Sequence, residues 1–322
     1  MVRIGLLLVH HYRLLSVAAI LDVFETVNQL AGSAQENLPF EIRFYQQSAD
    51  FKNDFFENYA IRSTADRGDL PDLILIPSFK HENISTAIQD NLESVGWLNK
   101  MAAQGSEIAT FCTGAFLLGA SGLLSGKIAT THVDACTAFR TAFPDVNLRA
   151  DLTVTHDGGL YTSGGATSSF HLMLHLIRKF CGSKQAIAVA KIFAIDMDRK
   201  QQSYFSTFNI ERTHLDPLVK LAQEKIEEGY QQTVTIEELI KDIPSSRRNM
   251  LRRFKLVTGI TPIEYLQQTR IAAAKKLLEQ TAEQMNEVIY KSGYSDPKAF
   301  RKVFKKNVGM TPKAYRDKFY YG

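Results

Sequence analysis

The side chain with the clearest potential for chemistry is Cys112, which lies at a predicted corner between a strand and a helix. Residues 107–111 are typical of a buried strand, and residues 115–120 are typical of a helix. Such a corner presents its side chain at the carboxyl end of a parallel sheet, and the amino end of the following helix can lower the pKa of a thiol. The pattern therefore indicates a position for a nucleophile. An inert small residue in a tight turn is the alternative.

Two histidines, His171 and His175, are four residues apart on one predicted helix and share a face. Such a pair can ligate a metal ion, but no third ligand and no HExxH-type glutamate accompanies it. The three cysteines, Cys112, Cys136 and Cys181, have no CxxC or Cys/His spacing. We therefore expect no metal and no cofactor, and we interpret both histidines as core or interface residues.

The elements that would position Cys112 form an alternating pattern over the first two hundred residues. The order predicts a mostly parallel, flavodoxin-like sheet with helices on both faces. The run at 2–9 is far shorter than the roughly 18 residues of a membrane span, so we interpret it as a buried strand and expect no membrane partner. Predicted strands cover residues 2–9, 41–46, 73–77, 107–111 and 160–163, and predicted helices cover 17–30, 91–103, 115–120, 168–180 and 184–195.

At 322 residues the chain is long enough for two domains. We expect an α/β domain at 1–195, a polar linker at 196–215 and an all-helical domain at 216–322. Residues 216–322 contain 20 Lys and Arg against 13 Asp and Glu, a net charge of +7, whereas residues 1–215 contain 18 against 21, a net charge of −3. A basic unit of this kind suits a polyanion, because neutralising phosphates supplies affinity that does not depend on base sequence.

The basic domain contains an internal repeat. The motif FKxxxGxTPxxY at 254–265 recurs at 304–315, with six identities at one offset of 50 residues. The repeat predicts two helix-turn-helix units, at about 233–260 and 283–310.

The helix that leads into each copy of the motif has a buried face and a basic face. Met250 and Phe254 form the predicted buried stripe of the first helix, and Phe300 and Phe304 form that of the second. The side chains predicted to contact DNA lie mainly on the remaining faces; they are Arg247, Arg248, Asn249, Arg252, Arg253, Lys298, Arg301 and Lys302.

Two basic helices in tandem predict recognition of a duplex. A helix fits the major groove, about 12 Å wide, and Arg or Lys near its amino end can reach guanine. A connecting helix at about 263–280 would hold the two in successive grooves, about 34 Å apart. The alternative is a helical bundle whose solvated faces bind protein; two copies in register favour DNA.

Residues 230–320 resemble the AraC/XylS class of transcription regulators. The resemblance rests on SxRxxxRxFK at 246–255 and on the GxTPxxY that ends each copy. It implies that Arg248, Arg252, Lys298 and Lys302 occupy base-facing positions. It also implies double-stranded DNA as the partner and transcription regulation as the function.

Residues 1–195 resemble the ThiJ/PfpI-like branch of the class I glutamine amidotransferase superfamily. The resemblance is carried by the Cys112 corner, by TTH at 130–132, by TSGGA at 162–166 and by LDVF at 21–24. It implies a flavodoxin-like sheet, often dimeric, with Cys112 and His132 at the nucleophile and histidine positions. A domain of this kind followed by an AraC-like one resembles the GlxA group of regulators.

We do not expect catalysis by Cys112 and His132. Enzymes of this superfamily place a carboxylate near the cysteine from the loop after the first strand, but residues 10–16 contain no acid and Asp22 comes later, in a helix. His171 stands where relatives often carry an acid. Because a thiol without a base or an orienting acid lacks activation, we interpret the site as degenerate. We expect a small molecule to bind there, at Ser16, Cys112, Thr113 and His132.

These patterns predict a sequence-specific regulator that responds to an unidentified small molecule. We expect a cytoplasmic homodimer, since an odd number of cysteines is typical of a reducing compartment, and we expect contact with RNA polymerase. The alternative is a cysteine-dependent amidase, hydrolase or glyoxalase-like enzyme fused to a DNA-targeting domain. An aromatic cluster is interpreted as packing, with a lid or a dimer contact as alternatives; its members are Phe51, Phe55, Phe56 and Tyr59.

Overall fold

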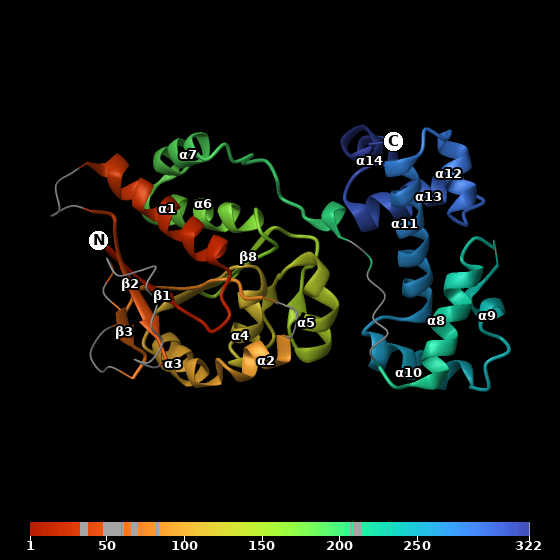
Figure 1. Ribbon diagram of the computed structural model, residues 1–322, viewed down its shortest axis with the longest axis horizontal. Helices are drawn as coiled ribbons and strands as arrows, with labels where there is room; N and C mark the ends of the chain where they lie inside the picture. Colours follow the sequence, from red (N-terminus) through yellow and green to blue (C-terminus); the bar gives the residue numbers. More distant parts are fainter. Residues whose placement is uncertain are drawn as a thin grey trace. The chain divides into compact units, whose positions relative to one another are not determined.

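The computed structural model divides the chain into two compact units, Met1–Gln202 and Ser203–Gly322 (Figure 1). It describes residues 1–32, 38–47, 59, 61–65, 70–80, 84–206, 208, 214–232 and 234–321. Phe51, Phe55 and Phe56 lie outside the described residues. Tyr59 packs edge-on against Phe44, with ring centroids 4.9 Å apart.

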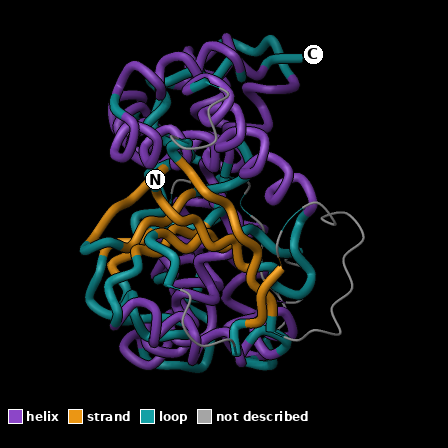
Figure 2. The backbone as a smooth tube through the Cα atoms, turned by 90° about the vertical axis from the view of Figure 1, so that its left-hand side faces the viewer, coloured by secondary structure: helices purple, strands orange, loops and turns teal. Residues whose placement is uncertain are grey.

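The first unit is built on a seven-stranded sheet in the order β3-β2-β1-β4-β5-β9-β8. Its strands are the orange segments of Figure 2. All neighbouring strands are parallel except the edge pair β9 and β8. The strands are β1 (Val2–Leu7), β2 (Phe40–Gln46), β3 (Ile61–Ser63), β4 (Leu73–Ile76), β5 (Glu107–Thr110), β8 (Val154–Asp157) and β9 (Leu160–Ser163). A separate pair, β6 (Ile128–Ala129) and β7 (Asn147–Leu148), is also parallel.

Helices cover both faces of this sheet, because each face carries its own apolar cluster. On one face lie α1 (Leu14–Ala31), α6 (Ser168–Cys181) and α7 (Ser183–Ile192). On the other lie α2 (Ile84–Gln89), α3 (Leu92–Ala103), α4 (Ala115–Ala120) and α5 (Cys136–Ala142). The predicted α/β architecture is confirmed, and the five predicted strands correspond to β1, β2, β4, β5 and β9.

Helix α1 is long and apolar enough, by length and composition alone, to cross a membrane. It packs in the α/β core instead, because one side of it is buried against the sheet and α6. The buried residues are Val17, Ile20, Leu21, Val23, Phe24 and Val27.

The edge strand β8 was not predicted, although its turn carries a signal. Gly158 and Gly159 join β8 to β9 with φ of 60° and 79°. Two adjacent residues with positive φ form the turn that two-residue hairpins prefer, and Asp-Gly or Gly-Gly sequences favour it. The hairpin makes the last pair of the sheet antiparallel.

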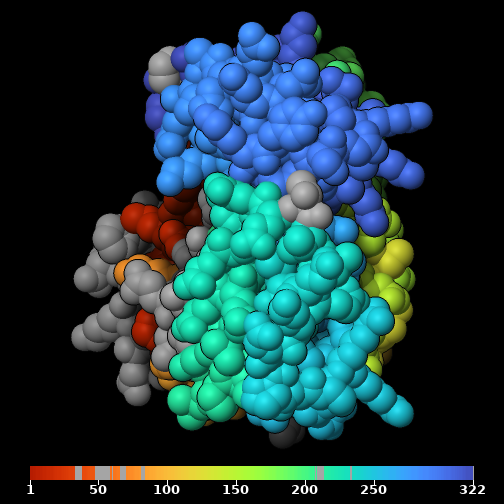
Figure 3. All heavy atoms as spheres, turned by 90° about the vertical axis from the view of Figure 1, so that its right-hand side faces the viewer, coloured from red at the N-terminus to blue at the C-terminus, as the bar shows by residue number. Residues whose placement is uncertain are grey.

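The second unit is entirely helical over its described residues. Its helices are α8 (Pro217–Gly229), α9 (Ile236–Leu239), α10 (Arg247–Thr258), α11 (Pro262–Gln280), α12 (Met285–Lys291), α13 (Pro297–Val308) and α14 (Pro312–Phe319). Two apolar clusters form two cores, one around Phe254 and Tyr265 and one around Phe304 and Tyr315. The two halves, cyan and blue in Figure 3, are joined by α11, which runs between them in Figure 1.

The first unit continues past residue 195, the boundary expected from the sequence, to Gln202. Backbone hydrogen bonds hold this added segment to the α/β unit: Thr153 N donates to Lys200 O at 3.1 Å, and Gln202 N donates to Asp151 O at 2.9 Å. On the other side of the boundary, Tyr204 packs with the core around Phe304. Polar composition alone does not reveal these contacts.

Candidate DNA-binding surface and N-terminal cysteine site

The repeated motif sets the ends of four helices. Helices α10 and α13 end at Gly259 and Gly309, whose φ values of 75° and 84° are left-handed and favour glycine. In each TP pair the threonine caps the next helix through its Oγ1, and the proline takes its first position. The GxTP spacing therefore ends one helix and starts the next at the same place in both halves.

Helices α10 and α13 bury the predicted stripes. Met250 and Phe254 are 2% and 0% exposed, and Phe300 and Phe304 are both 0% exposed. The opposite faces are exposed and cationic; they carry Arg248, Arg252 and Lys255 on α10 and Lys298, Arg301, Lys302 and Lys305 on α13. Residues 50 positions apart therefore hold equivalent places on α10 and α13, and most of the exposed ones are cationic on both helices.

Arg253 differs from the other predicted DNA contacts. Its guanidinium forms two hydrogen bonds of 2.9 Å with the carboxylate of Asp216, which caps α8. These hydrogen bonds hold the pKa of Asp216 below its ordinary value. The equivalent residue in the second half is Val303, which packs against the core. Position 253 therefore faces the interior of the unit, and its charge is used within the protein.

Three other members of the predicted set, Arg247, Asn249 and Arg252, also have partners inside the protein. Arg247 pairs with Glu237 at 2.7 Å, and its side chain is 76% exposed. Asn249 is half-buried; its amide donates to Ser245 Oγ at 3.1 Å, and its oxygen accepts from Arg252 at 3.3 Å. Asn249 thus orients the guanidinium of Arg252 on the exposed face.

The structure places Cys112 at the predicted corner, directly after β5. Its φ of 56° is in the left-handed region, a strained conformation for a residue with a side chain. The residue is 5% exposed. Burial raises the pKa of the Cys112 thiol, and this outweighs the backbone amides of Ala166 and Thr113, which favour the thiolate. The helix amino end therefore does not lower the pKa of this thiol, because desolvation dominates.

His132 lies against the glycine-rich segment that follows β9. A Cβ atom on Gly165 would come within 2.6 Å of its ring. Its Nδ1 accepts a hydrogen bond from Asp134 N at 3.2 Å. The neutral ring then carries its proton on Nε2, so this tautomer offers no basic nitrogen at Nε2 to a thiol.

Ser16 and Thr113 are linked through the segment that follows β4. Ser16 Oγ accepts from Ser78 N at 3.0 Å. Thr113 Oγ1 accepts from Phe79 N at 3.0 Å and donates to Phe79 O at 2.8 Å. The four predicted pocket residues therefore all belong to segments at the carboxyl edge of the parallel strands.

Asp22 and the two histidines, His171 and His175, lie on helices that cover one face of the sheet. Asp22 lies within α1. His171 Nε2 contacts Asp196 O at 2.8 Å, and His175 packs near His156 with ring centroids 5.8 Å apart. Within the part of the chain that the structure describes, no group of three potential ligands is placed to hold a metal ion.

Gln202 is the site residue that the sequence did not reveal. It is 1% exposed, and its amide nitrogen donates to Thr131 O at 3.0 Å, to Thr130 Oγ1 at 3.1 Å and to Ala150 O at 3.2 Å. Its amide oxygen accepts from Gly165 N at 3.2 Å. Gln202 therefore holds together the two segments that carry His132 and Ala166. A lone glutamine in a polar stretch has no sequence signal for this role.

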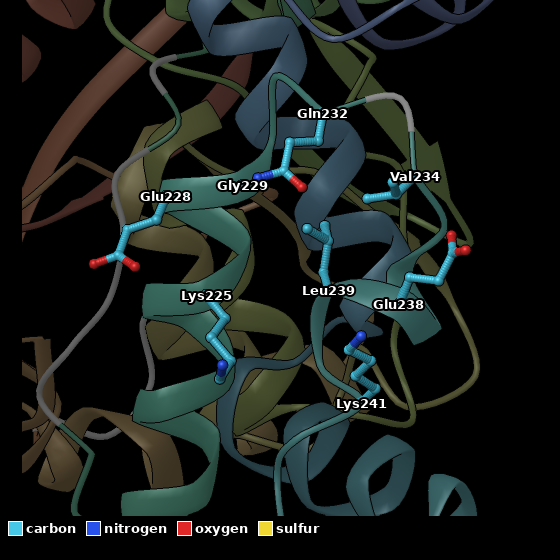
Figure 4. Close-up of a pocket in the computed structure, with 8 residues that line it drawn as sticks. All are labelled: Lys225, Glu228, Gly229, Gln232, Val234, Glu238, Leu239 and Lys241. Atoms are coloured by element: carbon cyan, nitrogen blue, oxygen red, sulfur yellow. The ribbon is translucent and has the colours of Figure 1, made fainter.

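A hollow of about 420 Å³ lies elsewhere, in the second unit between α8 and α9 (Figure 4). Its lining mixes charges of both signs, Lys225 and Lys241 with Glu228 and Glu238. Glu238 is already used, since it closes a capping box with Thr235. This hollow is separate from the predicted pocket residues, all of which belong to the first unit.

The fold and the two basic helices define a class: a DNA-binding protein that joins an α/β domain to tandem helix-turn-helix units. Comparison with known proteins agrees. Residues 71–179 match the DJ-1/PfpI family, and residues 241–318 match a helix-turn-helix domain. A putative transcriptional regulator from Vibrio parahaemolyticus shares the fold of the first unit, with 19% identity over 59% of this chain and 98% of that one, at a TM-score of 0.50.

Curated relatives extend the match to the whole chain. The HTH-type transcriptional regulator GbdR of Pseudomonas aeruginosa is 26% identical over 98% of this chain and 84% of its own length. The HTH-type transcriptional regulator GlxA of Rhizobium meliloti is 27% identical over 68% of each protein. The chain thus joins a DJ-1/PfpI-family domain to a helix-turn-helix domain and is similar over nearly its whole length to an HTH-type transcriptional regulator, so the predicted resemblance is confirmed. These relatives are regulators and not cysteine-dependent enzymes, in agreement with the class expected from the sequence.

Proposed function

We propose that this regulator binds a specific DNA duplex through α10 and α13. We also propose that a small molecule bound in the first unit controls this DNA binding. The DNA contacts we assign are Arg248, Arg252, Lys298, Arg301 and Lys302, with Arg247 at a phosphate. Arg253 and Asn249 are left out of this set, because one pairs with Asp216 and the other orients Arg252.

The observation that carries the proposal is the equivalence of the two exposed faces. Arg248 and Lys298, and likewise Arg252 and Lys302, are exposed at one offset of 50 residues. Helix α11 has 19 residues, a length of about 28 Å, which is comparable with the roughly 34 Å between successive major grooves. A bundle that bound only protein would have no reason to repeat this charge at this spacing.

The contacts of Gln202 support control by a ligand. Gln202, just before the second unit, is hydrogen-bonded to the segments that carry His132 and Ala166. A ligand that moves either segment would therefore change these hydrogen bonds. We place the ligand at Ser16, Cys112, Thr113 and His132. We extend the proposal to a cytoplasmic homodimer that contacts RNA polymerase, which the resemblance to known regulators supports.

The test is a gel shift with the full chain on duplexes that it selects from a random pool. Arg252→Ala and Lys302→Ala should each weaken specific binding by about 1 to 3 kcal/mol if each contact is bidentate or equally strong. Each should also reduce the slope of log affinity against log salt by about 1. Lys276→Ala, the same change at an exposed site on α11, is the matched control and should change neither quantity.

Unchanged affinity in both Arg252→Ala and Lys302→Ala would refute the assignment of the two helices. An equal loss in Lys276→Ala would show that only the total charge of the domain matters.

A further inference from the structure

One of the differences between the two helix-turn-helix units lies in the middle of their exposed cationic faces. At the offset of 50 residues, Leu251 of α10 stands where α13 has Arg301. The charges beside this position are kept, with Arg248 matching Lys298 and Lys255 matching Lys305. The side chain of Leu251 is nevertheless exposed, at 38%. An apolar side chain is thus presented to solvent within a cationic face.

Helical geometry puts Leu251 among the groups that reach DNA. It is three residues after Arg248 and four before Lys255, so the three side chains are neighbours on one face. It lies in the second turn of a helix of 12 residues. Residues in the amino-terminal part of a recognition helix contact base edges. Leu251 therefore faces the groove between two cations that anchor the helix.

The chemistry of the major groove gives these two residues different targets. The C5-methyl group of thymine is the apolar feature of that groove, and an apolar side chain is favoured against it. Guanine offers O6 and N7, which an arginine accepts in a bidentate pair. A leucine in this place would leave the guanine acceptors without a donor.

We propose that the two units read different half-sites, α10 a thymine through Leu251 and α13 a guanine through Arg301. This inference rests on the proposed function, since it assumes that both helices lie in major grooves. It makes the operator a pair of unlike half-sites in a fixed order, so the chain has one orientation on its site.

Two further positions within the repeated motif are apolar in the first helix-turn-helix unit and cationic in the second. Leu256 and Ile263 are 74% and 50% exposed, and the equivalent residues of the second helix-turn-helix unit are Lys306 and Lys313. At these two positions the second helix-turn-helix unit therefore presents positive charge where the first presents apolar side chains.

The test replaces single thymines with deoxyuridine, which lacks the C5-methyl group, in a duplex selected by the full chain. One replacement in one half-site should weaken the wild type about 4-fold, the loss that corresponds to about 0.8 kcal/mol for one buried carbon group. Leu251→Ala should bind the thymine and deoxyuridine duplexes equally. Leu256→Ala makes the same change in the last turn of α10 and should keep the full sensitivity to deoxyuridine.

A second arm tests the other helix. Replacing one guanine with 7-deazaguanine, which lacks the N7 acceptor, should weaken the wild type in the other half-site. Arg301→Ala should lose about 5- to 150-fold in affinity for the normal duplex and be insensitive to this base change.

The outcomes separate this inference from the proposed function. The inference is overturned if the selected duplex has no thymine whose replacement by deoxyuridine weakens binding, or if that sensitivity persists in Leu251→Ala. Either result leaves the assignment of two DNA-binding helices in place. Failure to select any specific duplex overturns both.

Discussion

At the scale of single residues, the charge of a side chain does not decide its role; its neighbours do. Arg252 and Arg253 are adjacent on α10, yet the first is exposed and the second makes a bidentate pair with Asp216. The helical repeat of 3.6 residues separates them by about 100°, enough to move a side chain from the groove to the interior. The second helix-turn-helix unit has Val303 at the equivalent position, where it packs against the apolar core.

Asp216→Ala tests the structural role of this pair. The substitution removes the N-cap of α8 and the partner of Arg253, so the free energy of unfolding should fall by about 1 to 2 kcal/mol. Arg253→Ala should destabilise in the same direction, and the double variant should lose less than the sum, because both changes remove one pair. Urea unfolding measures all three. Arg252→Ala is the control and should have little effect on stability.

The same pair fixes a pH dependence. The hydrogen bonds from Arg253 lower the folded-state pKa of Asp216 below its ordinary value of 3.8. Its stabilisation is therefore complete above that value and is lost as the pH falls through the folded-state pKa. The difference in stability between wild type and Asp216→Ala should be constant near neutral pH and shrink below about pH 4. A difference that grew on acidification would contradict the pairing.

At the scale of elements, the segment before the second unit is held by hydrogen bonds and not only by chain connectivity. Residues 196–202 contact the unit through backbone bonds, through His171 and through the buried amide of Gln202. A buried polar group that loses its partner costs about 1 to 3 kcal/mol. Loss of the contacts of Gln202 should therefore weaken the attachment of this segment to the first unit.

Gln202→Ala tests this hold directly. It removes the acceptor of the Gly165 amide, so exchange of that amide with solvent deuterium should become faster. Gln201→Ala, at the exposed neighbour, keeps the acceptor and should leave the exchange rate unchanged. Nuclear magnetic resonance of the full chain reads the single amide. Equal protection of Gly165 in both variants would mean that the side chain of Gln202 does not hold the segment.

At the scale of the whole molecule, the sequence predicted what local patterns determine. The duplicated GxTP spacing gave both recognition helices, because glycine, threonine and proline set helix ends by local geometry. The apolar runs gave the parallel strands and the corner at Cys112. The interior partner of Arg253 is 37 residues away in the sequence and that of Gln202 is 71, so neither could be read from spacing.

The pKa of the Cys112 thiol likewise could not be predicted from the sequence. The sequence indicates a helix amino end beside Cys112, which favours the thiolate, but the extent of burial is a property of the folded unit. Burial is the larger effect, and the pKa of Cys112 is raised.

The most direct test of the central claim is hydroxyl-radical footprinting of the full chain on its selected duplex at saturating protein. Two protected patches should appear on one face of the duplex, about one helical turn apart. Arg252→Ala should reduce protection mainly in one patch and Lys302→Ala mainly in the other. A single patch, or the same loss in both patches from either substitution, would contradict the reading of DNA by two separate helices.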